Sequence, residues 1–201
     1  MRVLACFVLT LVCASASAAE NVDALLEKAS AGLSRTFALE ARFHQRADFA
    51  FMDVPLESSG KLCFSLTERQ KIIFWEYREP ERSGFRWVDG DVELWTGQDS
   101  RPASDAEKRF LNGMTDQILQ WISFDPRRLK KRYHVSPGRM PLSLRFVPKE
   151  ESALFSSIEL TFSSDFSRIE ELRFTGRQED VTTIVFDAQR VNGELSEDCA
   201  R

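Results

Sequence analysis

The stretch LEARFHQRA, residues 39–47, alternates two kinds of side chain at every second position. Leu39, Ala41 and Phe43 share one parity, whereas the charged residues Glu40 and Arg42 share the other. Because successive side chains of a strand point to opposite faces of a sheet, this pattern predicts a β-strand with one buried face and one face in water. A sheet with one solvated face is typical of antiparallel strands.

The same period of two returns in many later segments. They centre on residues 62–66, 73–77, 85–87, 94–95, 142–146, 158–162, 172–174 and 182–186. Asp89-Gly90 separates two of these segments and is a strong signal for a two-residue hairpin turn. We therefore expect roughly nine antiparallel strands in one large, curved sheet.

Two segments show helical spacing instead. Asn21 could cap a helix that runs to about Ser34, and Ser104 with Glu107 forms the S-x-x-E capping pattern of a second helix that ends at Pro126. The apolar positions of the first helix are Val22, Leu25, Leu26, Ala29 and Leu33; those of the second are Ala106, Phe110, Leu111, Met114, Ile118, Leu119 and Ile122. The expected fold class is therefore α+β.

The N-terminus has the pattern of a secretory signal peptide. Arg2 precedes an apolar run over residues 3–12, and Ala16-Ser17-Ala18 is a small-x-small cleavage site. We expect residues 1–18 to be removed, with cleavage after Ala19 as the near alternative, and residues 19–201 to form a single domain. A lipid anchor at Cys13 is disfavoured because a small residue should precede such a cysteine.

Composition excludes several function classes. The chain has 201 residues, of which 43% are hydrophobic and 29% charged, and its formal net charge of −4 argues against a general nucleic-acid binder. His44 and His134 are its two histidines, and G-x-S-x-G, H-E-x-x-H and phosphate-cradling glycine motifs are missing from the sequence. We expect a protein that is not an enzyme and that carries no metal and no cofactor.

Removal of the signal peptide leaves two cysteines, Cys63 and Cys199. In an exported protein they can form one disulfide, or they remain two free thiols. The sharpest charge feature is the basic run over residues 127–132. It could meet acidic headgroups or an acidic partner, or it could be a solvated loop that follows the second helix.

Two helices are too few to cover a sheet of this size. The uncovered apolar face either packs against itself as an ordinary core or lines a cavity suited to acyl chains. Large aromatic side chains dominate this inward face: Phe43, Phe64, Trp75, Trp87, Phe146, Phe162 and Phe174. The alternation alone leaves both interpretations open.

The order and spacing of these segments resemble the LolA family of periplasmic lipoprotein carriers. Residues 39–45 are similar to the family's first strand with its F-x-Q, and residues 60–64 to its G-x-L-x-F strand. Residues 75–80 resemble the W-x-Y-x-x-P ending, residues 89–95 the D-G-x-x-L-W hairpin, and residues 144–149 the L-x-P-K strand. Arg69 stands six residues before Trp75, in the spacing of the family arginine, with Gln70 in place of the usual proline.

The resemblance implies an unclosed half-barrel whose helices form a lid over an apolar cavity, with Arg69 fastening the lid. It implies a monomeric periplasmic carrier that takes an acylated lipoprotein, or another lipid, from an inner-membrane transporter to an outer-membrane acceptor. The expected lipid-binding residues are Phe43, Leu62, Phe64, Ile73, Trp75, Phe85, Trp87, Leu144, Phe146, Leu160, Phe162 and Phe174. The alternative is a non-catalytic structural or interaction protein of the envelope with a filled core.

Overall fold

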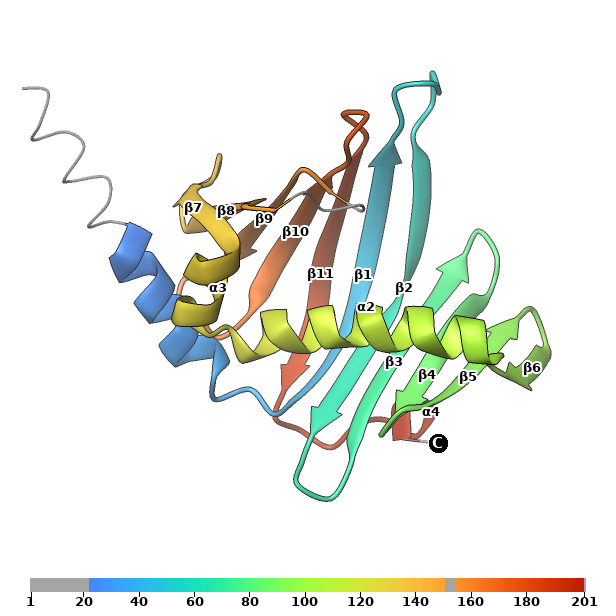
Figure 1. Cartoon of the computed structure of the whole chain (residues 1–201). Coiled ribbons are helices and arrows are strands. Elements are labelled where there is room, and N and C mark those ends of the chain that lie inside the picture. Colours follow the sequence, from blue (N-terminus) through green and yellow to red (C-terminus); the bar gives the residue numbers. More distant parts are fainter. Residues whose placement is uncertain (1–21, 151–154, 201) are drawn as a thin grey trace, which may run out of the picture.

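The computed structural model describes residues 22–150 and 155–200, and these residues form one large antiparallel sheet with three helices on one side and the short C-terminal helix on the other (Figure 1). The expected signal peptide and the capping role of Asn21 lie outside the described residues. The strands are β1 Ala38–Asp48, β2 Leu56–Leu66, β3 Lys71–Glu79, β4 Ser83–Val88, β5 Asp91–Thr96, β6 Asp99–Pro102, β7 Tyr133–Pro137, β8 Ser143–Pro148, β9 Ser157–Phe162, β10 Ile169–Thr175 and β11 Val181–Val191. The expected α+β class and the large unclosed sheet are confirmed.

The sheet consists of two meanders joined along β1. The strand order is β6-β5-β4-β3-β2-β1-β11-β10-β9-β8-β7, so every neighbouring pair except β1 and β11 is consecutive in the chain. The turn between β4 and β5 is the expected hairpin, in which Asp89 and Gly90 both have positive φ angles, of 51° and 105°. Such a turn matches the right-handed twist of the strands that it joins.

The helices are the segment over residues 22–33, α2 Asp105–Ser123, α3 Pro126–Arg132 and the short α4 Glu197–Ala200. The predicted capping box of α2 is confirmed, because the Ser104 N–H donates to Glu107 at 2.8 Å and the Glu107 N–H donates to the Ser104 hydroxyl. The Arg101 guanidinium, 2.7 Å from Glu107, and the bonds from Ser104 hold the pKa of Glu107 well below its usual range. Asp125 then caps α3 by accepting from the Arg127 N–H at 2.9 Å.

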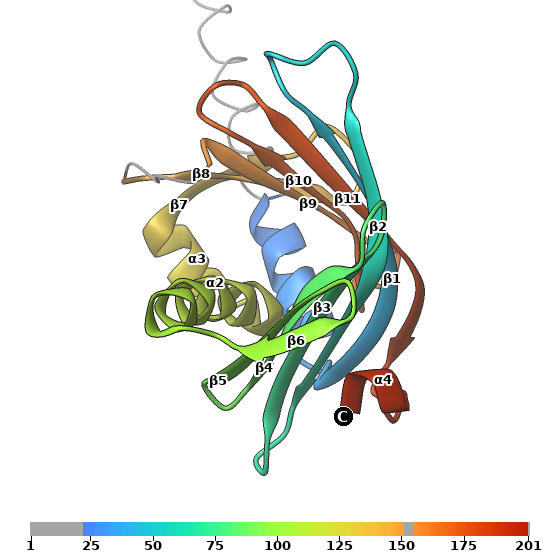
Figure 2. The same ribbon diagram turned by 90° about the vertical axis from the view of Figure 1, so that its right-hand side faces the viewer.

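The long helix α2 spans the open side of the sheet. It follows the edge strand β6 and leads through α3 to β7, the opposite edge strand. Figure 2 shows the sheet curving around α2, α3 and the helix of residues 22–33, which all lie on its concave side. No helix among the described residues is long and apolar enough to cross a membrane.

Three sequence expectations need correction. The sheet has eleven strands and not nine, because the edge strands β6 and β7 were missed. The basic run is not a loop but the helix α3, in which Leu129 is fully buried. Ala106 and Phe110, expected on the apolar face of α2, are exposed, whereas Leu111 of the same helix is buried.

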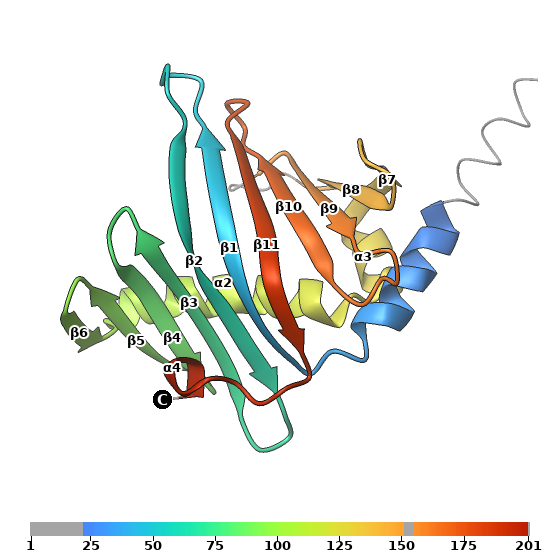
Figure 3. The ribbon, with the colours of Figure 1, turned by 180° about the vertical axis from the view of Figure 1, so that it is seen from behind.

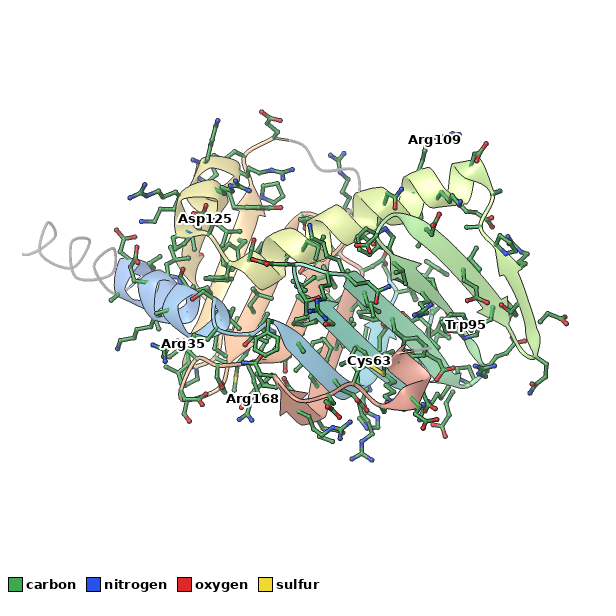
Figure 4. All side chains as sticks on the ribbon, turned by 90° about the horizontal axis from the view of Figure 1, so that it is seen from below. Arg35, Cys63, Trp95, Arg109, Asp125 and Arg168 are labelled. Atoms are coloured by element: carbon green, nitrogen blue, oxygen red, sulfur yellow. A yellow bond between two sulfur atoms is a disulfide. The ribbon has the colours of Figure 1, made fainter. Side chains whose placement is uncertain are left out.

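The C-terminal segment lies on the convex face of the sheet (Figure 3). Cys63 on β2 forms a disulfide with Cys199 of α4, with the Cα atoms 6.1 Å apart (Figure 4). The sulfurs are buried beside Phe74, Trp95 and Leu195, which form a small apolar cluster on the outer side of the sheet. The disulfide thus fastens a segment that follows the last strand.

A buried ion pair holds the same segment. Lys61 lies 2.9 Å from Glu40 and donates to the Ser196 hydroxyl at 2.7 Å, while the Ser196 N–H donates to Glu40. Burial alone would raise the pKa of Glu40, but the bonds from Lys61, Ser196 and Arg190 outweigh it and lower the pKa from 4.5 to about 2. The network therefore depends on an ionised carboxylate.

Candidate functional site

The candidate site is the concave face of the sheet, and the strand register builds it row by row. Phe64 pairs with Ile73, which pairs with Trp87, so these side chains form one row across β2, β3 and β4. Directly paired residues of antiparallel strands project to the same face. The register extends these rows across the sheet and places all twelve expected lipid-binding residues on the concave face: Phe43, Leu62, Phe64, Ile73, Trp75, Phe85, Trp87, Leu144, Phe146, Leu160, Phe162 and Phe174.

The buried side chains of this face form three clusters, which are connected by partly buried ones: Trp75 packs against two of the clusters, and so do Leu172 and Phe174. The three-helix cluster is built on β7–β10 and the helices at that end: Val22, Leu26, Ala29, Leu33, Phe124, Leu129, Tyr133, Leu144, Phe146, Phe155, Ile158, Leu160, Phe162 and Phe166. The α2 cluster lies under the middle of α2: Phe64, Ile73, Phe85, Trp87, Val92, Ala103 and Leu111. The central cluster between them is Phe43, Leu62 and Ile184.

The three-helix cluster is a closely packed aromatic core. The ring of Trp121, at the end of α2, packs edge-on against Phe146 at 5.0 Å between centroids. Phe124, which ends α2 in a left-handed conformation, packs edge-on against Phe162 at 5.5 Å. Edge-to-face contacts at these distances are favourable, so this end of α2 is firmly attached to the sheet.

The described cover of the α2 cluster includes polar as well as apolar side chains of α2. Leu111 and Leu119 of α2 pack on it, and Thr115 lies between them at helical spacing. The Thr115 hydroxyl is buried and has no hydrogen-bond partner among the described residues, an arrangement that costs about 1–3 kcal/mol. The indole N–H of Trp87 donates to the Asn112 side chain at 2.7 Å and so ties β4 directly to α2.

The central cluster depends on a glycine. Phe43 is fully buried, and its ring lies over Gly60 of the neighbouring strand, where an added Cβ would be 2.6 Å from the ring. The ring of Trp75 lies 4.9 Å from that of Phe43. Tyr77 donates to the Gln45 side chain at 3.1 Å, and burial raises the pKa of this tyrosine. The row of aromatic rings therefore continues across the middle of the sheet.

The family resemblance predicts that Arg69 fastens the helices to the sheet. Arg69 lies exposed in the turn between β2 and β3, and no hydrogen bond or ion pair joins it to the described residues of α2 or of the helix over residues 22–33. A hairpin turn keeps its side chain in water. The bond between Trp87 and Asn112, which sequence analysis missed, connects sheet and helix instead; no pattern in the sequence relates two residues so placed.

A groove with a volume of about 510 Å³ lies between the β2–β3 hairpin, α2 and α3. We call it the basic groove; it is lined by Leu66, Lys71, Leu119, Ser123, Arg128, Lys131 and Arg132. A second hollow of about 470 Å³ lies over Phe74 and Asp198 on the convex side. None of the twelve expected residues lines either hollow, since their side chains pack against one another and against the helices.

Comparison with known proteins defines the class. The profile of the family described as "Outer membrane lipoprotein carrier protein LolA" matches residues 34–199, which is most of the chain. The chain therefore belongs to the LolA family, and the resemblance noted in its sequence motifs is confirmed. A comparison with curated protein sequences finds no match.

Solved structures agree on the fold. The Pseudomonas aeruginosa MucA/MucB complex matches with a TM-score of 0.52 and 12% identity over 90% of this chain. The match covers 60% of that chain, so the protein spans about three fifths of MucB. An uncharacterised conserved protein from Thermus thermophilus matches with a TM-score of 0.50 and 11% identity, over 90% of this chain and 93% of that one. At these identities the likeness concerns the fold alone.

Proposed function

We propose that this protein is a periplasmic carrier that shields the acyl chains of lipoproteins, or of another lipid, on the concave face of its sheet during transport from the inner to the outer membrane. The observation that carries the proposal is the α2 cluster, in which aromatic side chains of neighbouring strands lie in rows under a single helix. That helix crosses them with a stripe containing a buried, unpaired threonine.

Such a face suits the thermodynamics of lipid transfer. Each methylene withdrawn from water contributes about 0.8 kcal/mol, so a sixteen-carbon chain left in water costs on the order of 12 kcal/mol. Only an extensive apolar surface can offset this cost. In the closed conformation the same aromatic side chains cover one another, and movement of α2 would exchange their mutual contacts for contacts with the acyl chain.

The described contacts of α2 differ between its end and its middle, and this difference supports such a movement. The helix is held at its C-terminal end by Trp121 and Phe124, which pack in the three-helix cluster. In the middle, the bond from Trp87 to Asn112 can break when cargo enters, and the Thr115 hydroxyl gains access to a partner. The helix can therefore act as a lid whose C-terminal end stays packed on the sheet while its middle moves away.

The proposed setting follows from the family and from the N-terminal sequence. The signal-peptide pattern of residues 1–18 supports export to the periplasm. The family description names a carrier of outer-membrane lipoproteins, which supports an inner-membrane donor and an outer-membrane acceptor. A carrier of this kind acts by binding and needs neither a catalytic group nor a second subunit.

Mass spectrometry of a lipid extract tests the proposal directly. The mature protein, purified without detergent, should carry acyl lipid. Trp75→Glu should abolish the signal, because it places a carboxylate on the half-buried concave face. The matched control is Val185→Glu, which adds the same charge at an exposed position on the convex face, and should retain the lipid. Lipid-free wild-type protein, or loss of lipid from both variants, would contradict the proposal.

One observation favours a second candidate, a non-catalytic interaction protein of the envelope with a filled core. The described side chains of the three-helix cluster are buried and closely packed, and a structural neighbour, MucB, was crystallised in complex with MucA. If this candidate is correct, the extract should contain no lipid. Neither glutamate variant should then change partner binding, because the partner would bind to another surface.

A further inference from the structure

The basic groove lies beside the apolar face but has a different chemical character. Three elements form it: the β2–β3 hairpin gives Leu66 and Lys71, the C-terminal part of α2 gives Leu119 and Ser123, and α3 gives three cations, Arg128, Lys131 and Arg132. Its described lining thus combines four cations with two leucines and contains no carboxylate. A volume of about 510 Å³ is in the range of small-ligand sites.

The cations of α3 are gathered on one side of the helix. Arg128, Lys131 and Arg132 are separated by three and four residues, so they share a face, whereas Leu129 is buried in the three-helix cluster. Like charges at this spacing repel and destabilise an isolated helix. Asp125 lies 3.4 Å from Arg128 and compensates part of this charge. An anion in the groove would interact favourably with all of these cations together.

The floor of the groove leads into the apolar site. Leu66 and Leu119 line the groove and also pack against the α2 cluster. A ligand seated among the cations would therefore meet a continuous apolar surface under α2. This continuity favours an amphiphile over an acidic peptide, because a peptide would have no use for the apolar floor.

We propose that the basic groove binds the anionic headgroup, of the phosphate class, of a lipid whose acyl chains lie on the concave face under α2. The inference rests on the proposed carrier function and adds the headgroup class of the cargo. Lys71 and Lys131 line the groove from two different elements, the β2–β3 hairpin and α3, and would both contact the headgroup. The lipid would thus be selected by its charge as well as by its chains.

Calorimetric titration with short-chain phospholipids below their micelle concentration tests the headgroup assignment. The probes are dihexanoyl phosphatidylglycerol and dihexanoyl phosphatidylcholine, which have the same chains and differ in net charge. We expect the anionic lipid to bind the wild-type mature protein about fivefold or more tightly, and this preference to shrink as added salt screens the groove. Lys71→Glu and Lys131→Glu should each remove the preference and leave binding of the zwitterionic lipid unchanged.

The matched control is Arg127→Glu. It makes the same charge change on an exposed residue of α3 that does not line the groove, and it should keep the preference. Equal binding of the two lipids by the wild-type protein, or a preference that survives Lys131→Glu, would overturn the headgroup assignment but leave the carrier function intact. Failure of both lipids to bind would overturn both proposals.

Two further titrations test whether the groove binds a free anion or an acidic peptide instead of a lipid headgroup. Inorganic phosphate should bind far more weakly than the anionic lipid, and equal affinity would assign the groove to a free anion. An oligoglutamate peptide should not compete with the lipid. Peptide binding that is lost in Lys131→Glu, with no preference between the lipids, would instead assign the groove to a protein partner.

Discussion

The three-helix cluster and the α2 cluster lie on the same face of one sheet, yet they are covered in different ways. The first is enclosed by the helix over residues 22–33, by α3 and by the end of α2, and its aromatic rings interlock. The second is crossed by α2, whose described side chains contribute two leucines, an unpaired threonine and one hydrogen bond to Trp87. The comparison indicates that one half of the face serves stability and the other half is available for binding.

The largest expected effect is a difference in the free energy of unfolding between a variant in the three-helix cluster and a variant in the α2 cluster. Phe146→Ala, in the three-helix cluster, should lower the free energy of unfolding by about 3–5 kcal/mol, because it leaves a cavity in a packed core. Leu111→Ala, on the buried side of α2, should cost about 2 kcal/mol, the low end for a buried leucine, since the helix can settle onto the sheet. Urea unfolding followed by circular dichroism measures both, and equal losses would remove the distinction.

The disulfide should stabilise both halves equally. It joins residues 136 positions apart on the convex face, away from both clusters. Replacing Cys63 and Cys199 by serine should lower the free energy of unfolding by about 2–4 kcal/mol, mainly through a freer unfolded chain. Lipid uptake by the folded double variant should be unchanged, and a selective loss of uptake would show that the convex face controls the lid.

Acid should weaken the same convex attachment. The pKa of Glu40 lies near 2 in the folded protein, below its ordinary value of 4.5, so its stabilising contribution is present above about pH 5 and is lost as the pH falls toward 2. We expect a loss on the order of 2 kcal/mol over this range, which Glu40→Gln should abolish while lowering stability at neutral pH. Thermal unfolding of both proteins from pH 7 to 2 provides the measurement.

The smallest expected effect concerns the lid itself. Asn112→Ala removes the hydrogen bond from Trp87 and should cost about 1 kcal/mol. Amide hydrogen exchange should then accelerate in α2 but not in the helix over residues 22–33. Arg109→Ala is the control, because Arg109 is exposed and points away from the sheet (Figure 4). Faster exchange in both helices would mean that the two halves open together.

The sequence predicts the central strands well because burial of one face imposes alternation on them. Phe64, Trp75 and Trp87 could therefore be assigned to one face before their register was known. The edge strand β6 shows no such alternation and therefore could not be predicted in this way. All four residues of β6 are exposed, so nothing in its side chains shows that its backbone pairs with β5.

Contacts between elements that are far apart in the chain could not be predicted from the sequence, for a different reason. Alternation shows which face a side chain occupies but not which helix covers it, so the division of the concave residues into clusters could not be foreseen. The pairing of Trp87 with Asn112 and the role of α3 in the basic groove both depend on how α2 lies across the sheet. Arg69 illustrates the converse, since a family spacing placed it at the lid and the structure places it in an exposed turn.

The link between the two edge strands sets a limit on how the protein can open. Eleven strands spaced about 4.8 Å apart would span roughly 48 Å if flat, whereas the 19 residues of α2, most of that link, form a helix about 28 Å long. In geometric terms the sheet is an arc and α2 is its chord. As long as α2 stays folded, the arc can widen only as far as the short segments at the two ends of the helix allow. We therefore expect bulkier cargo to extend along the strands and out of the ends of the arc, so that the protein limits the cross-section of its cargo but not its length.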